Sequence, residues 1–258
     1  MHPDESVRKF LKVDRGLITF GHPILDIRST EPLQEPFAIE FLTRFETEEG
    51  VRSVGTLLQG GSMKGQGRLM LDLHCLETTF RVLSSWKKRK RALPKYFFIN
   101  MEPDVLDSPL LWDNLPTWLG MLPVHPGRLV FEITEHYLAD LNRMTDLITH
   151  LRRFGVKVAV DDLGAGSASL NALAKFEPDF IKLDKSLIEN ARVHQGSTIQ
   201  NALLKALATF AREAGIGLIA EGIETPDELS VVTNSEIHYV QGFLFGVPHR
   251  IEHSEQRG

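Results

Sequence analysis

The sequence of 258 residues contains a single cysteine, Cys75, and lacks any long apolar run. One cysteine excludes an intrachain disulfide, and no apolar segment approaches the roughly 20 residues that a membrane span needs. A net charge of -5 offers no global attraction for nucleic-acid polymers or anionic membranes. The opening residues, MHPDESVRKF, also lack the apolar core of a signal peptide. We therefore expect a cytoplasmic protein that binds neither membranes nor nucleic-acid polymers.

What remains is the composition of a globular protein, with 42% hydrophobic and 24% charged residues. Short β-branched and aromatic runs alternate with longer amphipathic stretches, which is typical of βα units around a parallel sheet. Strands are expected at about 17–27, 37–45, 96–101, 128–134, 157–163, 180–184, 217–223 and 239–245. Helices are expected near 69–91, 108–119, 140–153, 167–175, 197–214 and 225–233, with boundaries good to about two to four residues.

The eight expected strands predict an α/β fold, an irregular TIM-like (β/α)8 barrel. No helical pattern separates the first two strands, so we expect the first strand to be antiparallel. Neither a linker nor a change of composition divides the chain. We therefore expect one domain over residues 1–258, with a core at about 17–249 and short terminal extensions.

Two segments stand out by composition. Residues 46–68 carry six glycines and few apolar residues, so we expect a long loop there, either a surface excursion or a lid over a ligand. A run of five cations, from Lys87 to Arg91, falls at an expected helix end. Cations complement the helix dipole there, so a solvated terminus is favoured over a patch for nucleic acid or a partner.

Polar side chains recur in strands that are otherwise apolar. A carboxylate in a buried strand costs free energy unless a cation, a metal ion or a hydrogen-bond donor compensates it. Each such residue has a structural explanation of its own, as an edge residue, a salt-bridge partner or a cap. Their recurrence near the carboxyl ends of successive strands instead predicts one polar pocket. The residues are Glu40, Asn100, Glu132, Asp161, Asp162, Lys182, Glu221 and Gln241.

The composition of this pocket narrows its chemistry. Facing carboxylates cannot all stay ionised without cations, and two hard divalent ions would satisfy them. Oxygen ligands favour Mg²⁺ or Mn²⁺ over zinc, since Cys75 and the scattered histidines show no zinc-ligand spacing. The adjacent Asp161 and Asp162 suit a dinuclear site, and Lys182 can orient a water or stabilise a departing oxygen. The sequence therefore predicts hydrolysis of a phosphate ester.

Eight motifs, taken in order, resemble those of the EAL domain family, the cyclic di-GMP phosphodiesterases with an irregular TIM barrel. HPILD resembles the opening QPI-V-D, EFLTR stands where the family has E-A-L-x-R, and FFINMEPDVL resembles the N-x-S segment. FEITE, DDLGAG and FIKLD are similar to E-x-T-E, D-D-F-G-T-G and the K-I-D strand. AEGIE and YVQGFLFGVP resemble A-E-G-V-E and Y-x-Q-G-Y-x-F-x-x-P. The resemblance runs from about Leu17 to His249.

The resemblance implies a site for two divalent cations, Mg²⁺ or Mn²⁺. Four residues would hold the first metal: Glu40, Asn100, Glu132 and Asp161. Asp161 would bridge to a second metal, which Asp162 and Glu221 complete. Lys182 and Glu221 would position and deprotonate the attacking water, and so would be the catalytic residues. The family cleaves one 3'-phosphodiester bond of cyclic di-GMP to give linear pGpG, which lowers this bacterial second messenger.

The resemblance also implies roles around the metals. Arg44 matches an arginine that contacts a phosphate, and further residues match positions lining the substrate groove: His22, Leu42, Asp184 and Gln241. Glu135 matches a residue that steadies the loop after the Asp-Asp pair. That loop couples the metal site to dimerisation in the family, so a homodimer is expected. The sequence identifies no regulatory protein partner.

Several positions depart from the family pattern. Phe41 replaces an alanine beside Glu40 and is large enough to crowd the metal site, and His22 replaces a glutamine. Leu163 and Ala165 replace a phenylalanine and a threonine in the loop, so one hydroxyl is missing. These changes motivate a second hypothesis, a receptor that binds cyclic di-GMP without cleaving it.

Two further hypotheses remain open from the sequence. The first is an interaction module that binds no nucleotide. The second is a barrel enzyme with Lys182 as a Schiff-base nucleophile. An amine surrounded by acids stays protonated and is a poor nucleophile, which argues against the second.

Overall fold

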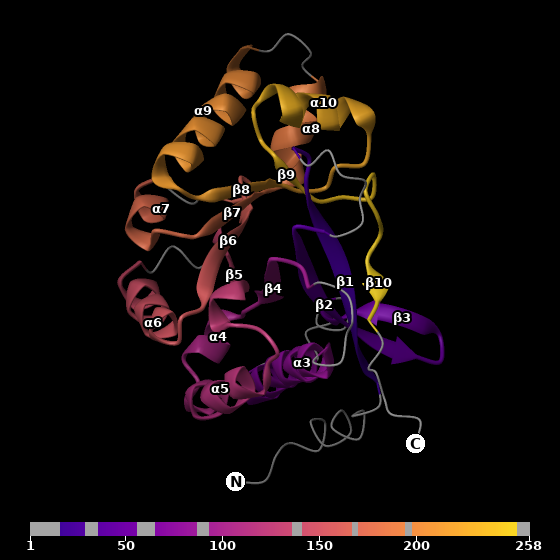
Figure 1. Cartoon of the computed structure of the whole chain (residues 1–258), viewed down its shortest axis with the longest axis vertical. Coiled ribbons are helices and arrows are strands. Elements are labelled where there is room, and N and C mark those ends of the chain that lie inside the picture. The colour runs from indigo at the N-terminus through magenta and orange to yellow at the C-terminus, as the bar shows by residue number, and fades with distance from the viewer. Residues whose placement is uncertain are drawn as a thin grey trace.

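The computed structural model describes residues 16–28, 36–55, 65–86, 93–135, 141–166, 170–193 and 198–251. The cationic run at 87–91 and residues 56–64 of the expected loop lie outside these ranges. The described chain forms a barrel with helices around it (Figure 1). Within it, no helix is both long enough and apolar enough to cross a membrane.

All eight expected strands are present and close into a barrel. Seven run parallel to one another: β2 (Ala38–Thr47), β4 (Tyr96–Asn100), β5 (Leu129–Thr134), β6 (Lys157–Leu163), β7 (Phe180–Leu183), β8 (Gly217–Ala220) and β9 (Tyr239–Val240). Strand β1 (Leu17–Asp26) pairs antiparallel with both β2 and β9. This pairing closes the barrel and confirms the antiparallel first strand.

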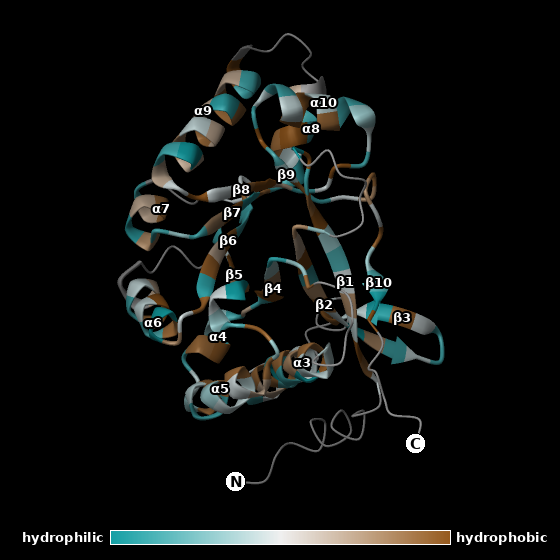
Figure 2. Cartoon of the chain, viewed as in Figure 1, coloured by the Kyte–Doolittle hydropathy of each residue, from teal (hydrophilic) through white to brown (hydrophobic). Residues whose placement is uncertain are grey.

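Helices lie around the outside of the strands (Figure 1). Their bounds are α3 (Gln66–Ser85), α4 (Pro103–Leu106), α5 (Pro109–Met121), α6 (Leu141–Arg153), α7 (Leu170–Phe176), α8 (Lys185–Val193), α9 (Thr198–Ala214) and α10 (Pro226–Asn234), with a 3₁₀ turn at Pro126–Arg128. Local sequence sets several starts: Ser108 caps α5 ahead of Pro109, and Thr225 with Glu228 forms a capping box on α10. Hydrophilic and hydrophobic residues both occur along α9, as on other outer helices (Figure 2).

The expected loop at 46–68 is wrong over its first part. Strand β2 continues to Thr47 and turns at Gly50, whose φ is +116°, into β3 (Gly50–Ser53). The hairpin was missed because its side chains are polar and mostly exposed, so no apolar alternation marks it. Strand β10 (His249–Arg250), which pairs with β1, was missed for the same reason. Helices α4 and α8 were also missed, since α4 is only one turn and α8 follows β7 after one residue.

Two apolar cores share the strands. Residues on the outward faces pack against the helices, while a smaller cluster fills the barrel interior. The interior cluster takes one residue from most strands: Ile24, Ala38, Phe98, Val130, Ala159, Phe180 and Ile219. Because side chains alternate between faces, the residue two positions further along each strand also points inward. The interior core thus determines which residues face the carboxyl end of the barrel.

Phe98→Ala is predicted to lower the free energy of unfolding by about 3–5 kcal/mol, because Phe98 is fully buried inside the barrel and contacts the Phe180 ring edge-on. Urea denaturation followed by circular dichroism measures the loss. Phe210→Ala is the matched control. Phe210 is 37% exposed on α9, so its loss should stay within about 0.5 kcal/mol. Equal losses in the two variants would contradict an interior core at Phe98.

Candidate metal and catalytic centre

The predicted polar pocket forms at the carboxyl end of the barrel. Each of its central residues lies two positions after a residue of the interior core, as Glu40 follows Ala38 and Lys182 follows Phe180. The same spacing holds for four more: Asn100, Glu132, Asp161 and Glu221. Inside the barrel, a layer of polar side chains therefore lies next to the apolar interior core, on the side of the carboxyl ends of the strands.

Lys182 is the centre of this layer. Its Nζ atom lies 2.6 Å from Glu132 Oε1, 2.6 Å from Glu221 Oε1 and 3.0 Å from Asp161 Oδ1. Glu40 Oε1 is more distant, at 3.8 Å. The lysine side chain is only 2% exposed, so these carboxylates replace the water that would otherwise solvate its charge.

Burial and charge shift the pKa values in opposite directions. Burial by itself lowers the pKa of Lys182, but the surrounding carboxylates, Asp161 first, outweigh it and hold the pKa well above its ordinary value. Burial raises the pKa of Glu132 well above its usual range and that of Glu221 to about 8. The raised pKa of Lys182 favours its charged form, in line with the argument against a Schiff-base nucleophile.

Glu40 is held by two side-chain amides. Gln241 Nε2 donates to Glu40 Oε2 at 2.7 Å, and Asn100 Nδ2 donates to Glu40 Oε1 at 3.3 Å. Gln241, predicted to line the groove, is 2% exposed and faces Glu40 from the position directly after β9. Both amides fix the orientation of the carboxylate.

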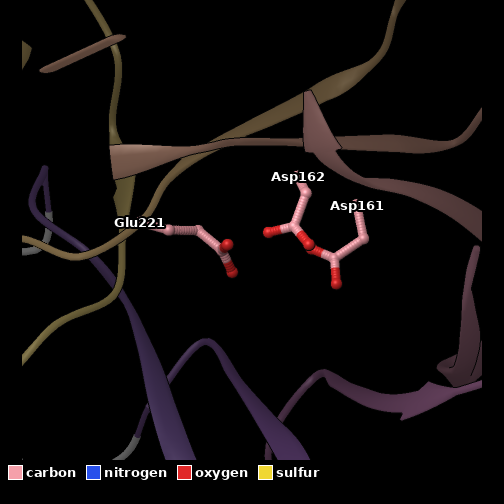
Figure 3. A group of neighbouring side chains, drawn as sticks. All are labelled: Asp161, Asp162 and Glu221. Atoms are coloured by element: carbon pink, nitrogen blue, oxygen red, sulfur yellow. The ribbon is translucent and has the colours of Figure 1, made fainter. Parts of the chain in front are cut away.

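Asp162 reaches the pocket through an irregular backbone. Adjacent residues of a strand normally point to opposite faces, but Asp162 has a φ of +57°, and the β6–β7 register shifts between Val160 and Leu163. As a result Asp161, Asp162 and Glu221 point toward one another (Figure 3), with ligand oxygens all within 4.8 Å. Burial, and then the charge of Asp161, raises the pKa of Asp162.

These residues fit a centre for hard divalent cations. All the candidate ligands offer oxygen: four carboxylates lie around one ammonium group, and Asp162 adds a fifth beside Asp161 and Glu221, so the acids outnumber the central cation. Among the described residues, neither oxygen of Glu132 nor Oδ1 of Asp161 accepts a hydrogen bond of ordinary geometry, although Lys182 lies close to both groups. Buried oxygens with this capacity are suitable cation ligands.

The loop after β6 contacts the end of β5. Glu135, 3% exposed, accepts a hydrogen bond through Oε2 from the backbone N–H of Gly164 at 3.1 Å. Gly164 has a φ of +104°, and a Cβ there would meet Leu187 Cδ1 at 2.5 Å, so glycine is needed. This contact agrees with the expected place of Glu135, whose functional role stays a prediction.

The expected groove residues flank the centre from several elements. His22 pairs with Glu40 in the β1–β2 register, contacts Gly246 O at 3.2 Å through Nε2, and has a pKa lowered by burial. Arg44 is half-buried and contacts the carbonyl of Thr43 at 3.1 Å. With Leu42 it lines a cavity of about 290 Å³. Asp184 accepts a hydrogen bond from Ser186 N–H at 2.9 Å.

Sequence reasoning missed two residues near this centre. Arg68 lines the same cavity as Arg44 and forms ion pairs with Asp72 and Glu102 at 2.8 and 3.0 Å. Its i, i+4 spacing to Asp72 was the available signal. Phe243 is 59% exposed, and its ring centroid lies 6.2 Å from that of His22. The only signal in the sequence was its position two residues after Gln241.

The expected crowding by Phe41 is wrong. Phe41 points away from Glu40, is 2% exposed, and packs in the outer core with ring centroids 5.7 Å from Trp86 and 6.1 Å from Phe97. Strand alternation puts neighbouring residues on opposite faces, so a larger side chain at this position fills space under α3 rather than space at the centre.

In metal-free protein, stability is predicted to fall as pH rises from about 4.5 to about 8. Glu221 binds its proton more tightly in the folded state, where its pKa is raised from 4.5 to about 8. Its contribution to the free energy of unfolding is therefore fully present below about pH 4.5 and is lost as the pH rises through about 8. Urea denaturation in a chelating buffer measures this slope, which Glu221→Gln should flatten. The exposed Glu77→Gln should leave it unchanged. A rise in stability over this window would contradict the assignment.

Comparisons with known proteins agree with the fold and the carboxylate centre described above. A family model described as EAL domain matches residues 6–248. The probable cyclic di-GMP phosphodiesterase PdeN of Escherichia coli is 32% identical over 59% of this chain and 29% of its own. The cyclic di-GMP phosphodiesterase RocR of Pseudomonas aeruginosa is 31% identical over 60% of this chain and 39% of its own. The chain thus spans less than half the length of either relative.

Solved structures share the fold. The PaMucR phosphodiesterase in complex with c-di-GMP matches 95% of this chain and 96% of its own, with a TM-score of 0.78 at 23% identity. A manganese and cyclic di-GMP complex of BlrP1 from Klebsiella pneumoniae matches 92% of this chain and 57% of its own, with a TM-score of 0.78 at 25% identity. With a family model matched over nearly its whole length and a barrel of this kind, the chain belongs to the EAL domain family.

Proposed function

We propose that this protein hydrolyses cyclic di-GMP to linear pGpG with two divalent cations, Mg²⁺ or Mn²⁺. The observation that carries the proposal is the convergence of Glu40, Glu132, Asp161 and Glu221 on Lys182, with Asp162 turned toward the same space. Relatives named as cyclic di-GMP phosphodiesterases and solved complexes with this nucleotide support the substrate.

Six residues would hold the cations. Glu40, Asn100, Glu132 and Asp161 would bind one, and Asp161, Asp162 and Glu221 the other. Bound there, the cations would lower the pKa of water and neutralise charge on the phosphoryl oxygens. The amides of Gln241 and Asn100 keep Glu40 in one orientation, which preorganises the ligand set before substrate arrives.

Lys182 and Glu221 would act on the attacking water. The Nζ atom of Lys182, protonated and 2.6 Å from Glu221 Oε1, fixes the carboxylate and leaves Glu221 Oε2 to receive the proton of the water. The charge of Lys182 also offsets the charge that builds on the reacting phosphate. Its buried position prevents bulk water from weakening these interactions.

The groove residues would orient the dinucleotide. Arg44 would contact a phosphate oxygen through a charge-assisted hydrogen bond, as its place in the cavity beside Asn100 permits. Four others would line the groove: His22, Leu42, Asp184 and Gln241. The position of Phe41 on the outer face of β2 speaks against one of the two reasons for a receptor without catalysis, while the altered loop residues Leu163 and Ala165 keep that second hypothesis open. A homodimer and a cytoplasmic location remain predictions from the sequence.

Glu40→Gln and Asp161→Asn are each predicted to reduce turnover by at least about a hundredfold, since each removes an anionic ligand from the preformed centre. Product formation from cyclic di-GMP with Mg²⁺ or Mn²⁺ is followed by ion-pair chromatography. Glu77→Gln, an exposed change on α3, is the matched control and should retain full turnover. A pGpG peak of parental size from both ligand variants would overturn the two-cation assignment.

Lys182→Ala is predicted to lower kcat more than substrate affinity, because its ammonium group contacts the catalytic carboxylates. Turnover and cyclic di-GMP binding are measured on the same sample with Mn²⁺ present. Lys185→Ala, on the exposed start of α8, is the control and should change neither. A collapse of affinity with unchanged turnover per bound ligand would make Lys182 a binding residue.

Ca²⁺ should bind yet support less activity than Mg²⁺, since it accepts looser coordination.

A further inference from the structure

A second cavity, of about 400 Å³, lies at the opposite end of the barrel from the proposed catalytic centre. The first residues of five strands line it: Tyr96, Lys157, Phe180, Gly217 and Tyr239. In β4, β6 and β8 the polar layer around Lys182 begins four residues further along, at Asn100, Asp161 and Glu221, beyond the interior core. The cavity is therefore separate from the proposed active site, and its size falls in the range of about 300–1,000 Å³ that is usual for small-molecule sites.

Aromatic rings form one side of this cavity. Phe37 and Tyr239 stack with ring centroids 4.1 Å apart, although they come from opposite ends of the sequence. Tyr96 and Phe180 meet edge-on at 5.0 Å. Together these four rings close the amino-terminal end of the barrel and leave part of their surface on the cavity.

Residues of α9 and the start of β8 also line the cavity, and several of them are apolar. Ala208, Ala211 and Leu218 are buried there. A Cβ on Gly217 would lie 2.3 Å from the Phe180 ring, so only glycine fits at that position. The Phe180 ring packs directly on Gly217, and Ala208, Ala211 and Leu218 add apolar surface to a lining that also carries charged groups.

The cavity also carries more cations than acids. Four basic residues line it, namely Arg28, Lys95, Lys157 and Arg212, against Asp179 and Glu236. Lys157 pairs with Asp179 at 2.6 Å, and Arg212 with Glu236 at 2.8 Å. Arg28 pairs with Asp26.

Lys95 is the cation best placed to meet a ligand. It is exposed, and its Nζ lies 5.8 Å from the Phe37 ring centroid and 5.4 Å from that of Tyr96. In the part of the chain that the structure describes, no carboxylate is within ion-pair distance of it. A cation held over aromatic rings at a cavity can exchange this weak attraction for an anion.

We propose that this cavity binds a planar aromatic anion of the nucleoside monophosphate class. The base would pack in the apolar space between the aromatic rings and α9, and the phosphate would meet the cationic side at Lys95. An inorganic anion would leave the apolar space empty, and a neutral ring would leave the cations unmatched. The inference does not depend on the proposed hydrolysis.

The test is titration of the full chain with AMP, adenosine and inorganic phosphate by isothermal calorimetry. AMP is chosen because its base differs from the guanine of the substrate proposed for the other site. AMP should bind with one site per chain, and adenosine and phosphate should each bind at least about tenfold more weakly. Phosphate binding as tight as that of AMP, or no heat from AMP at millimolar concentration, would overturn the proposal.

Two variants locate the site. Lys95→Glu should weaken AMP at least about tenfold, while Lys205→Glu, an exposed reversal on α9 outside the cavity, should not. Arg212→Glu provides a second cavity variant, and circular dichroism melting verifies that each variant folds. Glu40→Gln should keep AMP affinity unchanged, which separates this site from the catalytic centre. Unchanged AMP affinity in the cavity variants, or its loss in Glu40→Gln, would refute the inference.

Discussion

The buried ammonium group of Lys182 is the interaction on which the catalytic end of the barrel depends. Four carboxylates, those of Glu40, Glu132, Asp161 and Glu221, lie within 3.8 Å of its Nζ atom, and their crowding in a largely buried layer needs the positive charge that Lys182 supplies. The buried ammonium group and the buried carboxylates stabilise each other. Removing the lysine or the acids would leave the remaining charge buried without a partner. The remaining negative charge is what makes the centre selective for small cations with high charge.

The barrel accommodates this centre by dividing its interior into two layers. Near the amino-terminal ends of the strands the inward residues are apolar and pack on each other; two residues later they are polar. The apolar layer fixes the positions of the strands, and the strands in turn fix the side chains above them to within the tolerance that chemistry requires. Separate regions therefore supply rigidity and reactivity, although the same strands carry both.

Much of this could be predicted from the sequence. The eight strands were visible as apolar runs, and Glu40, Glu132 and Lys182 were visible as polar residues that such runs should not contain. The inward turn of Asp162 was not visible, because it depends on a positive φ and a register shift that alternation cannot reveal. The outward direction of Phe41, by contrast, follows from strand alternation once Glu40 is placed inward. The hairpin at β3 carries mostly exposed residues, and backbone hydrogen bonds pair it, helped by the Thr47 hydroxyl, which donates to the carbonyl of Gly50 at 2.8 Å.

Strand β1 closes the barrel by pairing with segments from both ends of the sequence, β2 on one side and β9 and β10 on the other. The hydrogen bond between Gln241 and Glu40 spans 201 residues, and the contact between His22 and Gly246 spans 224. Contacts so distant in sequence form only after most of the chain has been ordered, and they slow folding because of the entropy of closing long loops. A nascent or partly folded chain therefore has no assembled ligand set, so cation binding would report that folding is complete.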